Sequence, residues 1–337
     1  MTAVDLPPGH RRRRPTVDDV PAIYQLIAAH NTALIGAPDL TEDDLYDEFA
    51  DAGFDPAADA WLVTDGDGRT AGYAWAARKG TSAEVNLDFY VDPGADPGLA
   101  GLLLTLTEAR AAEIGRELGH AEIRVGKGCY REARDEAALL TGRGYTVATT
   151  FSRMSRPLEG APDDPPIPAG VVLRVCGADH DLLRAAHGVK ELAFVDHFGS
   201  VPQTFGEWYS RHADRSATDW SQVWLAELDG QPVGMLLGTN AFIPTDNAGY
   251  VQTLAVHPEA RGRGLAKLLL RIAFAEMRRR GRSKVILDVD TNNTSGAPAL
   301  YESLGMHPDL RVDVWRCARR TEPAGSDQPS GSPGLSP

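Results

Sequence analysis

A glycine-bearing turn between a strand and a long helix is the part of this chain whose residue types best suit chemistry. Residues 256–266 read VHPEARGRGLA. Residues 250–256 are rich in β-branched and aromatic side chains, and apolar residues recur at helical spacing over 265–277. The first N–H groups of a helix lack intrahelical partners and carry the positive end of the helix dipole. Gly262 and Gly264 would let a pyrophosphate approach those groups, so the turn is predicted to be an anion cradle.

The spacing of this turn separates it from the common nucleotide loops. A P-loop needs Gly-x-x-x-x-Gly-Lys-Ser/Thr, and a dinucleotide loop needs Gly-x-Gly-x-x-Gly. This turn has only Gly-x-Gly, with Arg261 and Arg263 beside it. An ordinary strand-to-helix turn with two surface arginines is the alternative interpretation of the turn alone.

A second segment places a tyrosine on one side of a short helix. Residues 284–289 predict a buried strand, and residues 292–306 then read NNTSGAPALYESLGM. Asn293 or Thr294 can cap a helix that continues through Tyr301. Taken alone, this tyrosine could simply pack against the protein.

The two segments, in this order, resemble the GNAT acyltransferase superfamily. In that family an Arg-x-x-Gly-x-Ala loop holds the acyl-CoA pyrophosphate, and residues 261–266 match this loop. An Asn then precedes a helix with the pattern Leu-Tyr-x-x-x-Gly-Phe. Residues 300–306 match this pattern except at the last position, which is Met306 here. The resemblance implies acetyl-CoA as the co-substrate, direct attack of an amine on the thioester, and Tyr301 as the acid that protonates the departing thiolate. It also implies a set of cofactor contacts, which are Leu254, Ala255, Val256, Arg261, Gly262, Arg263, Gly264, Leu265, Ala266, Lys267 and Asn293.

The group that accepts the proton from the amine is left open by the sequence. The candidates are Glu191, Asp196, His197, Gln252, Asp288 and Asp290, of which the first four are also predicted to contact the acceptor. His197 titrates near neutrality and Asp196 could orient it, but adjacent residues on a helix point in different directions. Residues 191–199 are therefore expected to form a wall of the acceptor pocket, with the base reached through water.

The chain also has the organisation of a tandem duplication. A proline-dense stretch at residues 157–170 is typical of a linker, and each side of it repeats one order of predicted helices and strands. The expected fold is α/β (α+β), with two tandem GNAT folds. Each has a mixed, mostly antiparallel sheet flanked by helices and a V-shaped splay at the CoA site. We expect domains at 1–156 and 171–318, with a disordered tail at 319–337.

The two predicted domains differ at the cradle. In the first half, Asp92 and Asp96 stand near the positions of the arginines, where they would repel a pyrophosphate. Leu139 and Leu140 occupy the place of the Leu-Tyr pair. Residues 1–156 are therefore expected to be a degenerate GNAT-like domain and residues 171–318 the catalytic one.

Composition limits the partners of the chain. Its 337 residues carry a formal net charge of −13, which argues against nucleic acid and anionic membranes as partners. An acidic chain would favour a cationic amine, although solubility explains the charge equally well. The three cysteines and nine histidines show no metal-ligand spacing, so no metal is expected and a reducing cytoplasm fits. The oligomeric state stays open, and a monomer is compatible with the sequence.

The whole-chain pattern is similar to tandem-GNAT proteins of actinobacteria, among which are the mycothiol synthases. Those enzymes carry an acidic residue early on the strand before the CoA loop, where this sequence has Tyr250 or Gln252. The predicted function is therefore acetylation of another small primary amine. The alternatives are mycothiol synthase itself, a protein lysine acetyltransferase, and a CoA-binding sensor without catalysis.

Overall fold

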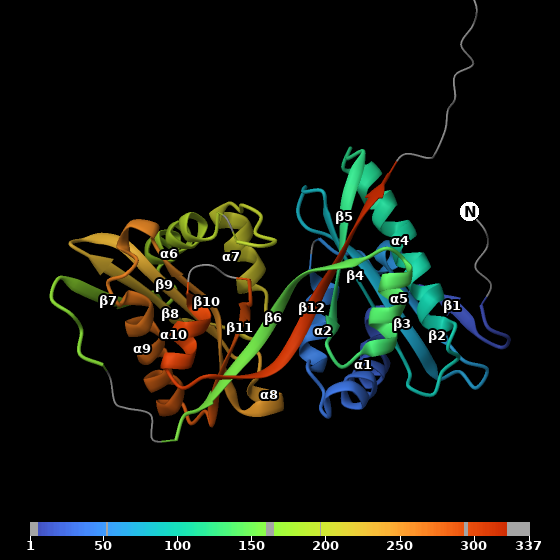
Figure 1. The fold of residues 1–337 in the computed structure, drawn as a ribbon, viewed down its shortest axis with the longest axis horizontal. Coiled ribbons are helices and arrows are strands. Elements are labelled where there is room, and N and C mark those ends of the chain that lie inside the picture. The colour runs from blue at the N-terminus through green and yellow to red at the C-terminus, as the bar shows by residue number, and fades with distance from the viewer. Residues whose placement is uncertain (1–5, 52, 160–164, 196, 293–295, 322–337) are drawn as a thin grey trace, which may run out of the picture.

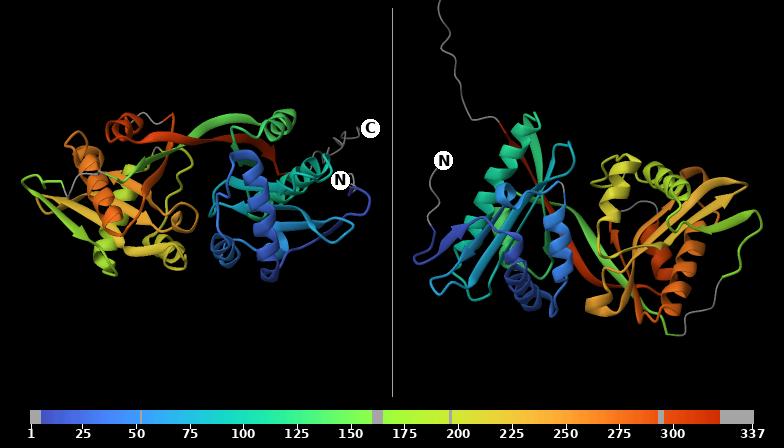
Figure 2. Two further views of the ribbon diagram at one scale, coloured as in Figure 1. Left: turned by 90° about the horizontal axis from the view of Figure 1, so that it is seen from below. Right: turned by 180° about the vertical axis from the view of Figure 1, so that it is seen from behind.

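The computed structural model describes residues 6–51, 53–159, 165–195, 197–292 and 296–321. The chain forms two lobes joined by two long strands that lie side by side between them (Figure 1). Figure 2 shows the same two strands, which run from one lobe to the other, from below and from behind. Each lobe is a curved part of the sheet with helices packed on its faces.

The N-terminal half alternates helices and strands as the sequence predicts. Its elements are β1 (Arg11–Arg13), η1 (Val17–Asp19), α1 (Val20–Ile35), α2 (Glu42–Ala50), α3 (Pro56–Asp59), β2 (Ala60–Thr64), β3 (Thr70–Arg78), β4 (Glu84–Val91), α4 (Leu99–Glu117), β5 (Glu122–Tyr130), α5 (Arg134–Gly142) and β6 (Thr146–Pro157). Capping explains several of these boundaries. The Thr41 hydroxyl oxygen, for example, accepts a hydrogen bond from the N–H of Asp44 at the start of α2, and the Asp44 carboxylate accepts one from the N–H of Thr41.

The second half repeats the order. Its elements are β7 (Val171–Val175), α6 (His180–Ala193), α7 (Phe205–Ala213), β8 (Thr218–Leu228), β9 (Gln231–Thr239), α8 (Ile243–Asp246), β10 (Ala248–Val256), η2 (Pro258–Ala260), α9 (Leu265–Arg279), β11 (Lys284–Asp290), α10 (Ala297–Ser303) and β12 (His307–Arg320). The small helix α8 is not matched by any predicted element.

All of these strands join one 12-stranded sheet in the order β1-β2-β3-β4-β5-β12-β6-β11-β10-β9-β8-β7. Among the strands of the described residues, only the pairs β4–β5 and β10–β11 are parallel. In each pair the strands hydrogen-bond at one end and then separate, so the predicted mostly antiparallel architecture with a splay in each half is confirmed. The separation matters because a strand without a neighbour offers its backbone groups to other partners.

The two halves exchange their last strands. The strand β6 closes the N-terminal half in sequence, yet it pairs with β11 of the second half, while β12 pairs with β5 of the first. The two exchanged strands also pair with each other, from His307↔Ser155 to Arg316↔Thr146. Assigning each terminal strand to its own half, as the sequence suggests, therefore misses the pairing that joins the lobes into one sheet.

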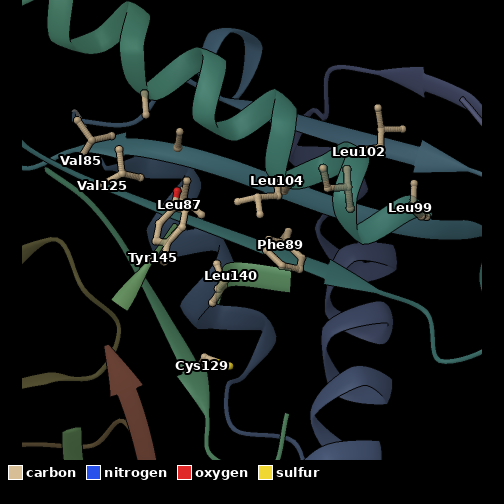
Figure 3. Packing of buried hydrophobic residues seen from close by; sticks show 14 of the residues in the cluster. Val85, Leu87, Phe89, Leu99, Leu102, Leu104, Val125, Cys129, Leu140 and Tyr145 are labelled. Carbon is tan, nitrogen blue, oxygen red and sulfur yellow. The ribbon is translucent and has the colours of Figure 1, made fainter. Parts of the chain in front are cut away.

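Each half has its own apolar core. In Figure 3 the leucines of α4 lie against apolar side chains of β4 and β5, which include Leu87, Phe89 and Val125. The corresponding core of the second half packs α9 against β10 and β11. Both helices cover their sheet with leucines spaced three or four residues apart, as an amphipathic helix must.

The end of β12 corrects one predicted boundary. Residues 319 and 320 belong to this strand, so the tail predicted to begin at 319 starts inside an ordered element. Thr321 is buried as well, and a Cβ on Gly115 of α4 would lie 2.5 Å from its methyl group. The predicted linker is bounded by β6 and β7, and its residues 160–164 lie outside the described part of the chain.

Candidate active site

The gap between β10 and β11 is the foundation of the site. These strands pair only from Ala248↔Lys284 to Val251↔Leu287, although both continue further. On its other edge β10 pairs with β9 through a register shift between Val251 and Thr253, which makes Gln252 the extra residue of a bulge. Beyond the bulge, β10 keeps only the β9 neighbour. The backbone of residues 254–256 therefore faces the gap without a strand partner on that side.

A cavity of about 870 Å³ fills this gap and extends beneath α6 and α7. Most of the predicted site residues line it, namely His197, Gln252, Leu254, Ala255, Val256, Arg261, Gly262, Gly264, Leu265, Ala266, Lys267 and Tyr301. Arg263 and Glu191 are not among the residues that line it. Asp196 and Asn293 lie outside the described residues.

The cradle turn has the backbone that an anion site needs. Gly262 and Gly264 both adopt left-handed conformations, with φ of 77° and 78°, which only glycine adopts at little cost. Gly264 is the N-cap of α9 and has no side chain to satisfy the first N–H groups of the helix. Those groups face the cavity, where the helix dipole adds partial positive charge.

The two arginines of the turn have different roles. The Arg261 guanidinium donates to the carbonyl oxygen of Ala193 at 3.3 Å, which ties the turn to the end of α6. Arg263 is exposed and is not among the residues that line the cavity, and its predicted contact with the pyrophosphate stays a prediction. The next lysine along, Lys267, does reach the cavity.

Tyr301 reaches the other side of the cavity from α10. This short helix begins after Gly296, whose φ of 77° makes the sharp entry into the helix. The tyrosine is 8% exposed, and burial raises its pKa to about 12. It therefore keeps its proton at neutral pH and can donate it.

Two carboxylates of β11 enter the cavity at its strand side. Asp288 accepts hydrogen bonds from the Tyr250 hydroxyl at 2.9 Å and from the Arg153 guanidinium at 3.4 Å. Asp290 accepts from the Thr149 hydroxyl. Arg153 and Thr149 belong to β6, so the exchanged strand of the N-terminal half holds both acids in place.

The segment predicted to form a pocket wall is only partly at the cavity. The imidazole of His197 stacks on the Phe194 ring at 4.3 Å, and both residues line the cavity. The Glu191 carboxylate instead accepts from the Lys190 ammonium at 2.6 Å and from the backbone N–H of Gln203 at 3.3 Å. Glu191 itself is not among the residues that line the cavity, and its predicted contact with the acceptor stays a prediction.

Sequence inspection missed the contribution of the N-terminal half to the cavity. Lys79, Gly80 and Thr81, which follow β3, line it together with Phe151 of β6. The Lys79 ammonium also donates to the carbonyl oxygen of Gly199. No local signal marks these residues, since only the exchange and the docking of the lobes bring them to the cavity.

The matching gap in the N-terminal half is filled by side chains. There β4 and β5 pair only from Glu84↔Arg124 to Asn86↔Gly126. The Lys127 ammonium, 4% exposed, lies 2.7 Å from Asp88 and 3.0 Å from Glu136, and Glu136 in turn contacts His30 at 2.9 Å. The turn before α4 is occupied as well, because Asp96 accepts from the N–H of Gly98, the N-cap.

Comparisons with known proteins agree with this geometry. Residues 191–306 match the model of the acetyltransferase (GNAT) family. The chain is 34% identical over 267 residues to a mycothiol acetyltransferase of Salinispora arenicola, covering 74% of this chain and 80% of that protein. The chain belongs to the GNAT acetyltransferase family. A mycothiol acetyltransferase of Thermobispora bispora is 32% identical over 251 residues, with coverage of 72% and 78%.

Solved structures show that this GNAT protein shares its fold with other members over nearly its full length. A GCN5-related N-acetyltransferase from Sphaerobacter thermophilus superposes with a TM-score of 0.79 at 29% identity, covering 95% of this chain and 98% of that one. A tandem GNAT protein from the clavulanic acid biosynthesis pathway gives 0.69 at 18% identity, covering 94% and 100%. The protein is thus a tandem GNAT N-acetyltransferase that uses an acyl-CoA.

No group of three or more His, Cys, Asp or Glu side chains in the described residues is arranged to hold a metal ion. No described helix is both long and apolar enough to cross a membrane.

Proposed function

We propose that this protein transfers the acetyl group of acetyl-CoA to the primary amine of a small molecule. The observation that supports this most is the convergence of three features on one cavity: the glycine turn at α9, the bulged strand β10 and the hydroxyl of Tyr301. The turn suits a pyrophosphate, the strand suits an extended chain of amides, and the hydroxyl suits a leaving group that needs a proton.

The acyl donor would lie along the gap between β10 and β11. Its pyrophosphate would accept hydrogen bonds from N–H groups of the Gly262–Gly264 turn, with Lys267 nearby. Its pantetheine amides would pair with the backbone of residues 254–256. One N–H of that strand would also stabilise the thioester oxygen as negative charge develops on it.

The reaction needs one proton to leave the amine and one to reach the sulfur. The neutral amine attacks the thioester carbon, the C–N bond forms, and the C–S bond then breaks. The Asp288 carboxylate is the base best placed to take the amine proton through a water molecule, because Tyr250 and Arg153 fix its orientation. Tyr301 protonates the thiolate and recovers its proton from solvent, and no covalent intermediate is needed.

The position of the cavity between the two halves favours a small acceptor over a protein tail. The Lys79–Thr81 turn of the first half and the loop at residues 197–203 of the second both line it, and the Lys79 ammonium donates to the carbonyl oxygen of Gly199. Acetylation of a mycothiol precursor is the second candidate, because curated relatives of 30–36% identity are mycothiol acetyltransferases. The neutral Tyr250 and Gln252 in place of an acid favour a different acceptor.

The test is release of free CoA thiol from acetyl-CoA with a panel of small primary amines. We expect turnover with one or more amines, and we expect Tyr301→Phe to lower kcat by about a hundredfold through loss of the acid. Tyr46→Phe, at an exposed tyrosine of α2, is the matched control and should behave like the wild type. Absence of turnover with every amine, although acetyl-CoA binds, would refute the proposal and support a CoA-binding sensor.

A further inference from the structure

The acceptor end of the cavity carries a cluster of cations, which we call the cationic cluster: Lys79, Lys190 and Arg211. Lys79 follows β3 of the first half, whereas Lys190 and Arg211 belong to the helices α6 and α7 of the second, and all three line the cavity. Burial lowers the pKa of Lys79. Glu84 opposes that change, but Arg316, Arg211 and Lys190 lower the pKa further. The cations are therefore close enough to repel one another.

The nearby carboxylates balance this cluster only in part. The Glu191 carboxylate pairs with Lys190. The Glu207 carboxylate lines the same end, but it accepts from the N–H and hydroxyl of Thr204 at 2.7 and 2.8 Å as part of the α7 cap. Among the described residues, Lys79 and Arg211 form no ion pair with a carboxylate.

A cluster of this kind is unexpected in a chain of net charge −13. Keeping Lys79 and Lys190 partly buried beside the charge of the exposed Arg211 costs free energy unless a counter-charge compensates for it. The cradle at α9 has its own cations, Arg261 and Lys267, so the cluster is not needed to hold the pyrophosphate. An anion on the second substrate would supply the missing counter-charge.

The geometry points to an acceptor that carries an anionic group, a carboxylate or phosphate, which the cationic cluster binds while its amine faces the thioester. This inference rests on the proposed function and names the substrate class of the same site. Lys79 makes the N-terminal half part of the acceptor site. The acids of β11 lie on the strand side of the cavity, where they suit the amine end of such a molecule.

The expectation from net charge alone, a cationic acceptor, is thereby refined. The overall field of the protein repels anions, but the local cluster outweighs it within the cavity because Coulomb energy falls with distance and with screening by salt. An amine without an anionic group would leave Lys79 and Arg211 without an anionic partner in the cavity.

The experiment compares acceptors in pairs that differ only in the anion. The acids are glycine, β-alanine, 4-aminobutyrate and O-phosphoethanolamine, and the matched neutral amines are glycinamide, β-alaninamide, 4-aminobutyramide and ethanolamine. We expect the acid to have the higher kcat/KM in at least one pair. The phosphate pair distinguishes a phosphate from a carboxylate. Equal or faster turnover of the neutral member in every pair would overturn the inference.

Variants assign the preference to the cluster. Lys79→Met and Arg211→Gln should each lower the ratio of kcat/KM between acid and neutral amine by about ten- to a hundredfold, the range for a hydrogen bond to a charged group. Their affinity for acetyl-CoA should not change. Arg78→Met, at the neighbouring residue that contacts Glu117 outside the cavity, is the matched control. An unchanged ratio in both variants would overturn the inference.

Failure of the inference and failure of the proposed function can be told apart. If no amine is acetylated, calorimetry with the four acids, in the presence of CoA, still tests the cluster. Binding of an acid to the wild type that is lost in Lys79→Met would support the anion subsite without any catalysis. Absence of binding for all four acids would overturn it.

Discussion

The two halves of this protein build the same gap between two parallel strands and use it in opposite ways. In the second half, the gap between β10 and β11 opens into a cavity of about 870 Å³. In the first, the gap between β4 and β5 is occupied by Lys127, Asp88 and Glu136. The fold therefore supplies an opening in each half, and the side chains decide whether it receives a ligand.

The turns before the long helices differ in the same manner. Gly264 leaves the start of α9 open, whereas the Asp96 carboxylate accepts a hydrogen bond from the N–H of Gly98 before α4. A carboxylate at that position satisfies the helix and repels a phosphate. We infer that only the second half binds an acyl-CoA.

The largest effect on acetyl-CoA binding is expected from a glutamate placed in the turn before α9, compared with a glutamate placed in the turn before α4. Gly264→Glu should weaken acetyl-CoA binding by about a thousandfold, because it adds a carboxylate and a strained left-handed residue to the cradle. Gly98→Glu, the matched variant, should leave binding unchanged. Calorimetry measures both, with circular dichroism as the check on folding. Equal loss in the two variants would contradict the assignment of the site to the second half.

Removing a carboxylate from each gap should separate catalysis from stability. Asp288→Asn should lower kcat by two to three orders of magnitude, as expected for loss of a general base, with little change in melting temperature. Asp88→Asn should instead destabilise the protein and leave the kcat of the folded protein unchanged, because Lys127 loses a buried partner. The pair is measured by thiol release and by thermal unfolding. A normal kcat for Asp288→Asn would exclude it as the base.

Low pH should destabilise the protein by protonating Glu136 in the gap between β4 and β5. Burial alone would raise the pKa of Glu136, but the Lys127 charge and the His30 hydrogen bond outweigh it and hold the pKa at about 2, below the ordinary value of 4.5. A lowered folded-state pKa stabilises the protein above pH 4.5 and loses that stabilisation, about 3 kcal/mol, as the pH falls toward 2. Urea unfolding at pH 6 and pH 3 measures the loss. Glu136→Gln should be less stable at pH 6 and less sensitive to acid, and an unchanged acid sensitivity would refute this role of the carboxylate.

The smallest effect is expected on stability, from a change where the chain at the end of β12 packs on α4. A Cβ on Gly115 would lie 2.5 Å from the Thr321 methyl group and 2.6 Å from Ile123. Gly115→Ala should therefore destabilise the protein by about 1–2 kcal/mol through overpacking. Adding Thr321→Ser, which removes that methyl group, should recover part of the loss. If the double variant recovered nothing, the packing of β12 on α4 would not be the cause.

Features that depend on neighbouring residues in the sequence could be predicted, and features that depend on contacts between distant residues could not. The cradle turn, the α9 helix and Tyr301 were predictable because spacing, glycine content and helical periodicity are local properties of the sequence. The contacts of Glu191 with Lys190 and Gln203 were not predictable, because they depend on how α6 and the next loop fold together. Arg153 and Lys79 carried no local signal at all.

The sequence by itself determined the order of helices and strands, the family resemblance and the half of the chain that holds the cradle. Tertiary structure alone decided that β6 and β12 change places, that β6 brings Arg153 to Asp288, and that Lys79 of the first half reaches the cavity of the second. The physical reason is that strand pairing and charge clustering depend on contacts between residues far apart in the chain. Local preferences fix an element but not its neighbour.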